Sequence, residues 1–190
     1  MFKSKDLHRQ ALPAIGRRQF LRLGAAAAAT LLASPVLASV TASRERKLDF
    51  QNTHTGESTS TVYWSEDRYV ESGLQEINSV LRDHRSDEIY PIDTDLLDLL
   101  FVLQSQVGCQ NAYQIISGYR SPATNSALRN KSSGVAKHSY HMQGKAIDIR
   151  LPGCELSTLR TAALEMKAGG VGYYPASDFI HVDVGPARRW

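Results

Sequence analysis

The sequence predicts an α+β fold, in which one compact domain packs a small, mainly antiparallel sheet against helices. Three observations support this prediction. Apolar residues recur at helical spacing mostly in the first half of the chain, and short β-rich runs gather mostly in the second half. The residues that follow an N-terminal leader are also numerous enough to build a single hydrophobic core.

The first 38 residues of the 190-residue chain have the composition of an export signal. Arg17-Arg18-Gln19-Phe20-Leu21 precedes a weakly apolar, alanine-rich stretch, and Ala38 offers a cleavage point. This order resembles a twin-arginine signal, which is read as R-R-x-F-L. The apolar run is shorter than the roughly 20 residues of a membrane-spanning helix. We therefore expect a signal peptide over residues 1–38, a periplasmic location, and no stable membrane insertion after processing.

The leader also carries the basic character of the chain. The formal net charge is +3, but the leader contains six of the 22 Lys and Arg residues and only one of the 19 acidic residues. The remainder has 16 basic and 18 acidic residues, so its net charge is −2. A nucleic-acid-binding protein needs a concentrated basic surface, and we therefore expect no nucleic-acid partner.

The folded domain is expected over residues 48–190, after a polar linker over residues 39–47. Alternating, Thr-rich segments around Thr55-Gly56-Glu57 predict a hairpin. Helical spacing predicts a helix over about residues 66–84, and a second helix that begins at Asp93 or Thr94 and ends near Gly108. The apolar positions are Val70, Leu74, Ile77 and Leu81 in the first helix, and Leu96, Leu97, Leu100, Leu103 and Val107 in the second.

The second half of the domain holds most of the expected strands. We expect strands over residues 113–117, 146–151, 171–173 and 179–184, helices near 122–130 and 156–167, and a polar loop over 131–137. Because the helices come mostly first and the strands mostly later, the sheet should be mainly antiparallel. Cys109 and Cys154 could pair in an oxidising compartment, but the sequence does not give the distance between them.

The segment from Ser139 to Asp148 holds the most informative side chains. His141 offers an imidazole nitrogen, and Asp148 offers a carboxylate seven residues later in an apolar strand. Gly144 between them permits a sharp turn that would bring both groups to one ion. A carboxylate between two isoleucines is costly to bury unless it is paired or metal-bound, whereas a solvated turn followed by an exposed strand position would need no metal.

His181 lies in a second apolar strand near the C-terminus. A strand histidine alone is more often a hydrogen-bonded core or surface residue than a metal ligand. Together with His141 and Asp148, however, it completes a set of two histidines and one carboxylate. Catalytic zinc sites use three protein ligands and leave a fourth position for water, whereas structural sites use four ligands and more cysteine.

The pattern S-x-H-x-x-G-x-A-x-D over residues 139–148, followed by a later strand histidine, resembles the zinc D-alanyl-D-alanine peptidase family, which includes VanX-type and VanY-type enzymes. Ser117-Gly118-Tyr119-Arg120-Ser121 is similar to an upstream element of that family. His54-Thr55-Gly56-Glu57 and residues 169–174 are most similar to the branch that contains murein endopeptidase K. The resemblance implies a Hedgehog/DD-peptidase-like fold and hydrolysis of peptidoglycan stem peptides.

The resemblance also implies roles for single residues. His141, Asp148 and His181 would bind one Zn²⁺, and Arg120 would bind the substrate carbonyl or the oxyanion formed from it. A surface salt bridge is the alternative for Arg120. The general base has two candidates. The family's E-x-x-H pattern places a glutamate three residues before the last ligand, and Asp178 occupies that position before His181 here. Asp183 shares a strand face with His181, so it is a candidate either for the base or for orienting a ligand.

Several residues, and the function itself, have more than one interpretation. His138 could contact substrate or be a solvated loop residue, while His54 and His84 are expected to be non-catalytic. Three tyrosines could line a groove or pack in the sheet, namely Tyr140, Tyr173 and Tyr174. The leading function is an endopeptidase that cuts D,D or L,D cross-links. The alternatives are a carboxypeptidase or dipeptidase on uncrosslinked stems, and a zinc-containing cell-wall binding module without catalysis.

Overall fold

The fold was analysed in a computed structural model that describes residues 45–132 and 134–190. The expected signal peptide over residues 1–38 and most of the expected linker, residues 39–44, lie outside the described residues. Within the described residues, no helix is both long enough and apolar enough to cross a membrane.

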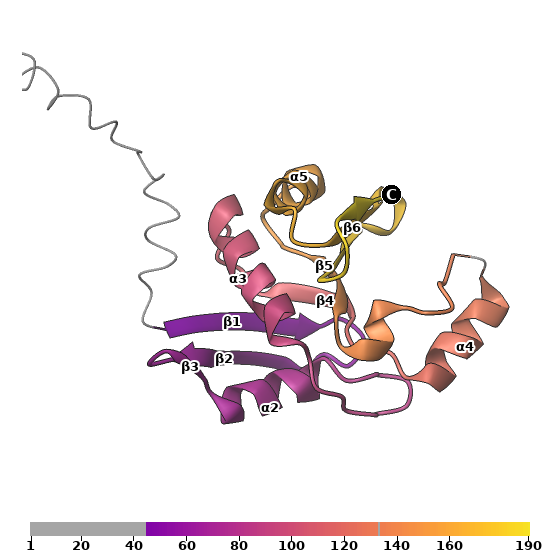
Figure 1. The fold of residues 1–190 in the computed structure, drawn as a ribbon, viewed down its shortest axis with the longest axis horizontal. Coiled ribbons are helices and arrows are strands. Elements are labelled where there is room, and N and C mark those ends of the chain that lie inside the picture. Colours follow the sequence, from indigo (N-terminus) through magenta and orange to yellow (C-terminus); the bar gives the residue numbers. More distant parts are fainter. Residues whose placement is uncertain (1–44, 133) are drawn as a thin grey trace, which may run out of the picture. The chain divides into compact units, whose positions relative to one another are not determined.

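The described residues form an α+β domain built on one eight-stranded sheet (Figure 1). The strand order is β3-β2-β1-β4-β5-β7-β6-β8, with parallel pairing only between β1 and β4 and between β6 and β8. The predicted fold class and the mainly antiparallel sheet are thus confirmed. The strands are β1 (Glu45–Asn52), β2 (Ser58–Ser65), β3 (Arg68–Tyr69), β4 (Tyr113–Ser117), β5 (Ala146–Arg150), β6 (Gly170–Tyr174), β7 (Phe179–Asp183) and β8 (Arg188–Arg189). The helices are α2 (Glu71–Val80), α3 (Thr94–Val107), α4 (Pro122–Lys131) and α5 (Leu156–Met166), with short 3₁₀ helices η1 (Tyr140–Gln143) and η2 (Pro175–Ser177).

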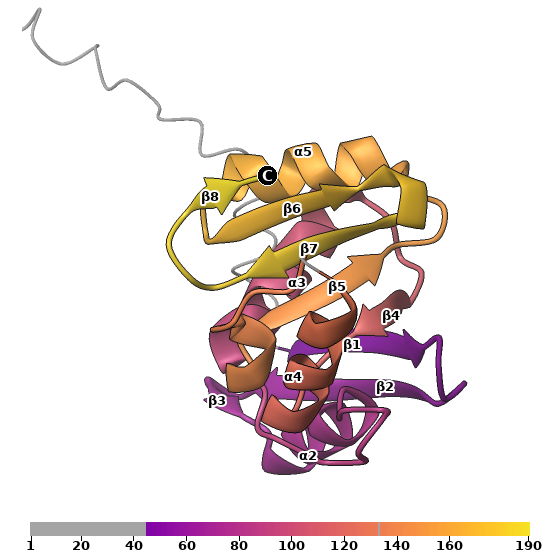
Figure 2. The ribbon, with the colours of Figure 1, turned by 90° about the vertical axis from the view of Figure 1, so that its right-hand side faces the viewer.

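The two faces of the sheet have different coverings. Figures 1 and 2 place α3 and α5 on one side of the sheet and α4 on the other. On the α3 side, buried aliphatic residues of α3 and α5 join those of the central strands in one hydrophobic core, which includes Leu97, Leu100, Ile147, Ile149, Leu159, Ile180 and Val182. Burying this apolar surface is the main favourable term in folding. The other face is therefore free to carry polar side chains.

Strand alternation and register bring a row of polar positions together on the α4 side. Ile147 and Ile149 enter the core, so Asp148 between them points to the opposite face. The same alternation in β7 turns His181 away from the core. Asp148 is directly opposite His181, and Gly172 of β6 pairs with His181 on its other side. The register of three adjacent strands therefore fixes where the site can form.

Most of the expected elements are present, but two boundaries differ. β1 begins at Glu45, so the last three residues of the expected linker belong to the sheet, where they pair with β2. The helix expected over residues 66–84 is shorter, because Glu66 and Asp67 adopt positive φ in a tight turn between β2 and β3. α3 begins after Asp93, whose side chain accepts a hydrogen bond from the Asp95 N–H, and it ends at a left-handed Gly108, as predicted.

The two cysteines lie near each other at one end of the sheet. Cys109 follows the C-terminus of α3, and its sulfur is 3.6 Å from the carbonyl oxygen of Gly153, next to Cys154. Both are partly buried free thiols in the structure. The disulfide considered from the sequence is therefore not formed here.

Candidate metal centre

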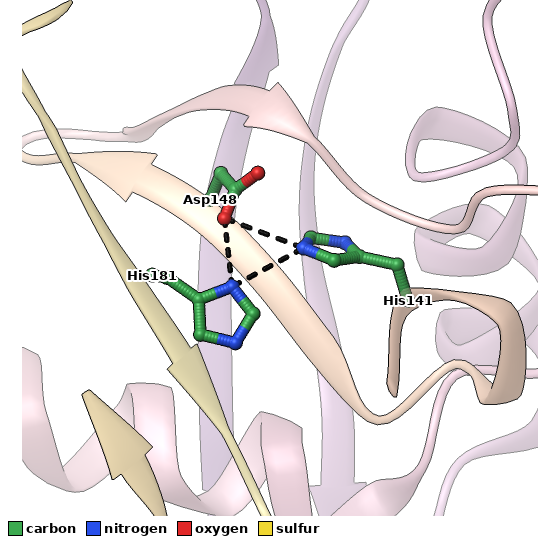
Figure 3. Close-up of side chains that lie close together, drawn as sticks. All are labelled: His141, Asp148 and His181. Carbon is green, nitrogen blue, oxygen red and sulfur yellow. Dashed lines mark hydrogen bonds and ion pairs between the residues drawn. The ribbon is translucent and has the colours of Figure 1, made fainter. Parts of the chain in front are cut away.

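His141, Asp148 and His181 converge from three separate elements into one site (Figure 3). His141 is in η1, which follows the polar loop, while Asp148 and His181 come from β5 and β7. Nε2 of His141 is 3.2 Å from Nδ1 of His181 and 3.3 Å from Oδ1 of Asp148. Nδ1 of His181 is 2.9 Å from the same carboxylate oxygen. All three side chains are buried.

The second nitrogen of each histidine is held by a protein acceptor. Nδ1 of His141 donates to the Gly118 carbonyl oxygen at 2.7 Å, and Nε2 of His181 donates to Oδ2 of Asp183 at 2.9 Å. When both rings are neutral, these two hydrogen bonds leave the lone pairs on Nε2 of His141 and Nδ1 of His181. An acceptor on the far nitrogen is the usual partner of a metal-bound histidine.

The three inward-facing atoms fit a tetrahedral metal ion. Zinc binds imidazole nitrogen and carboxylate oxygen at about 2.0–2.2 Å, so two tetrahedral ligand atoms should lie about 3.3–3.5 Å apart. The observed separations of 2.9–3.3 Å are close to that range.

Burial raises the pKa of Asp148, but His141 and His181 outweigh this effect and hold the pKa well below its usual range. The carboxylate is therefore ionised and available as a ligand.

Arg120 lies beside this triad, at the start of the loop that leads into α4. Its Nη2 is 3.7 Å from Oδ2 of Asp148, the carboxylate oxygen that does not face the histidines. The guanidinium also contacts the Asn125 side-chain oxygen at 3.4 Å and the Ser117 hydroxyl at 3.3 Å. Burial lowers the pKa of Arg120, while Asp148 opposes that shift. An arginine stays protonated in proteins, so a fixed positive charge adjoins the site.

The loop that carries Arg120 is anchored on both sides. The Tyr119 N–H donates to the Leu81 carbonyl oxygen at 2.8 Å, and the Arg120 N–H donates to the His141 carbonyl oxygen at 3.2 Å. The buried carboxylate of Asp83 accepts from the Ser121 N–H at 2.9 Å. The positions of Arg120 and His141 are therefore set by the same few backbone contacts.

The structure places Asp183 behind His181, on the side of the ring away from Asp148. Its side chain is 0% exposed. Besides the His181 ring, it accepts from the N–H groups of Gly170 at 3.1 Å and Gly185 at 2.9 Å, and it binds both Nη atoms of Arg188. Burial raises its pKa, but the hydrogen bonds from His181, Arg188 and the two glycines outweigh this and lower it. The Asp183 carboxylate contacts the His181 ring and does not face the space between the three candidate ligands.

Asp178 is not brought to the site. It has a left-handed backbone (φ 53°) at the end of η2, and Oδ2 accepts from Nη1 of Arg150 at 2.9 Å. Its side chain is 64% exposed. The chain does bend before Phe179, but the bend directs the carboxylate toward Arg150 rather than toward the histidines. The E-x-x-H-like placement considered from the sequence is therefore not adopted in this structure.

The triad opens into a cleft of about 520 Å³. One wall comes from the polar loop before η1, and the other comes from Tyr174, Phe179 and Trp190. The Tyr174 and Phe179 rings stack with centroids 4.6 Å apart, and Trp190 donates from Nε1 to the Tyr174 hydroxyl at 2.7 Å. Among the described residues that line this cleft, Asp148 is the one acidic side chain.

The other residues considered from the sequence fall in different places. Tyr140 and Tyr174 line the cleft, whereas Tyr173 packs against the core, with Arg160 over its ring. His138 is exposed and does not line the cleft. His54 and His84 stack on each other, with ring centroids 3.9 Å apart, and neither lines the cleft. Both rings therefore lie outside the cleft that contains the triad.

Two residues of the site, Arg188 and Trp190, were not predicted from the sequence. Both lie in or next to β8, a two-residue strand that gives no periodic signal. Arg188 reaches Asp183, and the Trp190 ring centroid is 5.2 Å from that of His181. The only hint of these two residues in the sequence is that an arginine and a tryptophan follow the strand that carries His181.

Comparison with known proteins identifies the family of this chain. Residues 40–190 match the family described as "Peptidoglycan L,D-endopeptidase MepK". The chain is 46% identical to the protein of that name from Escherichia coli K12, over 92% of this chain and 96% of the relative. It has the same identity and coverage with the protein of that name from Shigella flexneri. It is 40% identical to "Probable peptidoglycan L,D-endopeptidase MepK" from Haemophilus influenzae, over 92% and 95% of the two chains. The chain therefore belongs to the peptidoglycan L,D-endopeptidase MepK family.

Proposed function

We propose that this protein is a zinc-dependent peptidoglycan L,D-endopeptidase, which cuts cross-links between stem peptides during cell-wall remodelling. The observation that carries the proposal is the convergence of His141, Asp148 and His181 at the floor of an open cleft. The family supplies the substrate class and the choice of an L,D bond, which the sequence analysis had left open between D,D and L,D.

The choice of zinc rests on both the donor set and the family. Two histidines and one carboxylate with an open position suit a catalytic zinc, but the same donor set also binds non-haem iron. Hydrolytic members of the family that this sequence resembles use zinc, and the relatives named above are endopeptidases, which hydrolyse a peptide bond. One Zn²⁺ for each chain is the cofactor that fits.

Each residue of the site has a separate task in this proposal. Zinc bound there would lower the pKa of its water toward about 7 and polarise a carbonyl group. Arg120 donates hydrogen bonds to the carbonyl oxygen of the scissile bond, where negative charge develops. Asp148 uses one carboxylate oxygen as a ligand and faces Arg120 with the other. Asp183 holds His181 in the tautomer that presents Nδ1 to the metal.

The burial and contacts of the two aspartates argue against either as the general base. Asp183 is enclosed by five hydrogen bonds and Asp178 points to Arg150. Asp148 is the remaining carboxylate among the described residues of the cleft, and its Oδ2 is free of the histidines. Among the described residues, the cleft therefore holds no carboxylate besides the proposed ligand Asp148 that could serve as the base.

Export by the twin-arginine route and periplasmic location are part of the proposal. Arg17-Arg18 precedes a weakly apolar run in the leader, and peptidoglycan lies outside the cytoplasmic membrane. Replacing both arginines with lysine should retain the precursor in the cytoplasm, as measured by immunoblots of cell fractions. Normal periplasmic accumulation of this variant would contradict the route without affecting the proposed chemistry.

Digestion of purified sacculi tests the function. The zinc-loaded protein should release peptide-linked fragments, and mass spectrometry should place the cut at a bond between an L- and a D-centred residue of the cross-link. Release of terminal residues from uncrosslinked stems alone would indicate a carboxypeptidase or dipeptidase. Binding to sacculi without any product would indicate a non-catalytic module. His141→Ala is the inactive control.

A further inference from the structure

The last strand, β8, reaches the metal centre through one buried carboxylate. Asp183 is 0% exposed, and an ionised carboxylate buried to that degree needs a positive partner and several hydrogen bonds. Arg188 supplies the positive partner. Its Nη1 is 3.0 Å from Oδ1 and its Nη2 is 2.7 Å from Oδ2, so the guanidinium engages both oxygens.

Arg188 is itself fixed by its surroundings. The guanidinium lies 5.2 Å from the ring centroid of Tyr140 and 5.1 Å from that of Trp190. The backbone of β8 pairs with β6, and the Trp190 N–H donates to the Val171 carbonyl oxygen at 3.3 Å. A side chain larger than hydrogen at Gly170 would collide with the Arg188–Asp183 pair.

These contacts form a continuous path from β8 to the proposed metal ligand. Arg188 binds Asp183, Asp183 accepts the hydrogen bond of His181 Nε2, and His181 presents Nδ1 to Asp148 and His141. Oδ2 of Asp183 receives both Arg188 Nη2 and His181 Nε2. Arg188 therefore fixes the direction of the same carboxylate oxygen that orients the histidine.

We infer that Arg188 is a positioning residue of the metal centre, which holds His181 in its ligand orientation through Asp183 and so raises zinc affinity. This inference rests on the proposed zinc site. Lysine would keep the positive charge but lose the planar fork that binds both carboxylate oxygens. The neighbouring Arg189 offers a matched comparison, because it lies on the same strand and is exposed like Arg188, whereas the hydrogen bonds to Asp183 come from Arg188.

The test measures zinc affinity rather than turnover. Arg188→Gln, Arg188→Lys and Arg189→Gln are each titrated with zinc against a chelator of known affinity. Loss of a group that orients a metal-bound histidine typically costs 10- to 100-fold in metal affinity, so Arg188→Gln should bind zinc roughly 10-fold to 100-fold more weakly. Arg188→Lys should show a smaller loss, and Arg189→Gln should bind like the unchanged protein.

A double-mutant cycle separates positioning from a general effect on folding. If Arg188 acts through Asp183, the double variant Arg188→Gln/Asp183→Asn should lose little more zinc affinity than Asp183→Asn alone. The absorption spectrum of the cobalt-loaded protein should change in Arg188→Gln and Arg188→Lys but not in Arg189→Gln. If Arg188→Gln does not fold, the zinc affinity and the cobalt spectrum of Arg188→Lys are measured in its place.

The possible outcomes are distinct. Unchanged protein that binds no zinc would overturn the proposed function. Unchanged protein that binds zinc, together with Arg188 variants of equal affinity and unaltered spectrum, would overturn this inference alone. Losses that multiply in the double variant would also overturn it, since they would mean that Arg188 and Asp183 act independently.

Discussion

Asp183 accepts a hydrogen bond from Nε2 of His181 at 2.9 Å, while the opposite ring nitrogen, Nδ1, is 2.9 Å from Asp148. The imidazole is thus held between two carboxylates, of which one faces the cleft and the other is enclosed by β6, β7 and β8. This relationship separates a residue that would bind the metal from a residue that orients a ligand.

Asp183→Asn should weaken zinc binding more than it damages the chemical step. An amide cannot accept all of the hydrogen bonds that the carboxylate receives from Gly170, Gly185, Arg188 and His181. We expect roughly a 10- to 100-fold loss of zinc affinity, with turnover partly restored by added zinc. Zinc titration and sacculus digestion at low and saturating zinc measure both effects.

Asp178→Asn is the matched control for that experiment. Because Asp178 is exposed and paired with Arg150, zinc affinity and turnover should both stay close to those of the unchanged protein. An inactive Asp178→Asn beside a normal Asp183→Asn would reverse the roles that the structure indicates and restore an E-x-x-H-like arrangement.

Arg120→Lys should leave the metal in place and reduce turnover. The guanidinium is poised beside Asp148, and lysine cannot reproduce its fixed, multiple donors. Losing one donor to a developing oxyanion costs about 10²- to 10³-fold in turnover, and we expect a loss of at least about 10²-fold. Turnover per zinc-loaded molecule is the measurement. Arg129→Lys, on the exposed face of α4, should be normal. An Arg120→Lys variant that is unstable but fully active per folded molecule would indicate a structural salt bridge instead.

Gly118→Ala should destabilise the protein and disturb both sides of the site. A Cβ at this position would collide with the backbone of Leu81, so the loop must shift. The Gly118 carbonyl oxygen holds Nδ1 of His141, and the next residues carry Arg120. Overpacking costs typically about 1–3 kcal/mol, and we expect a loss of unfolding free energy of at least that size, together with weaker zinc binding. Denaturant unfolding measures the first effect. Gly134→Ala, which meets only a serine hydroxyl, should unfold like the unchanged protein.

His84 should reduce the stability of the metal-free protein as the pH decreases from about 6.5 to about 4. Burial, Arg85 and His54 lower the pKa of His84 to about 4, while Asp83 opposes the shift. The unfolded chain has a histidine pKa of about 6.5, so it binds a proton that the folded protein does not yet bind in this range. Protonation therefore favours unfolding as the pH falls through this window.

His84→Gln tests this dependence without touching the cleft. The unfolding free energy of the variant should change less between about pH 7 and about pH 4.5 than that of the unchanged protein. Unfolding curves in the presence of a chelator remove any contribution from bound metal. Parallel pH profiles for the two proteins would show that the pKa of His84 is not lowered in the folded state.

The sequence by itself determined the fold class and predicted which three residues come together as candidate metal ligands. Asp148 and His181 each lie between aliphatic residues in a short strand, and a period of two turns them away from the core. Gly144 adopts positive φ (65°) just after His141, as the expected turn requires. These features are local, so a pattern of residues along the chain is enough to reveal them.

Only the tertiary structure decided how the two candidate aspartates differ and what completes the site. Asp178 and Asp183 are close to His181 in the sequence, but their partners are Arg150 of β5 and Arg188 of β8. The short β8 and the bend at Asp178 leave no periodic signal. Their positions follow from pairing between strands that are distant in the sequence, because the register of a sheet is fixed by its neighbours and its buried face. The candidate ligands could therefore be recognised from local pattern, whereas the residues that contact them depend on how the sheet is assembled.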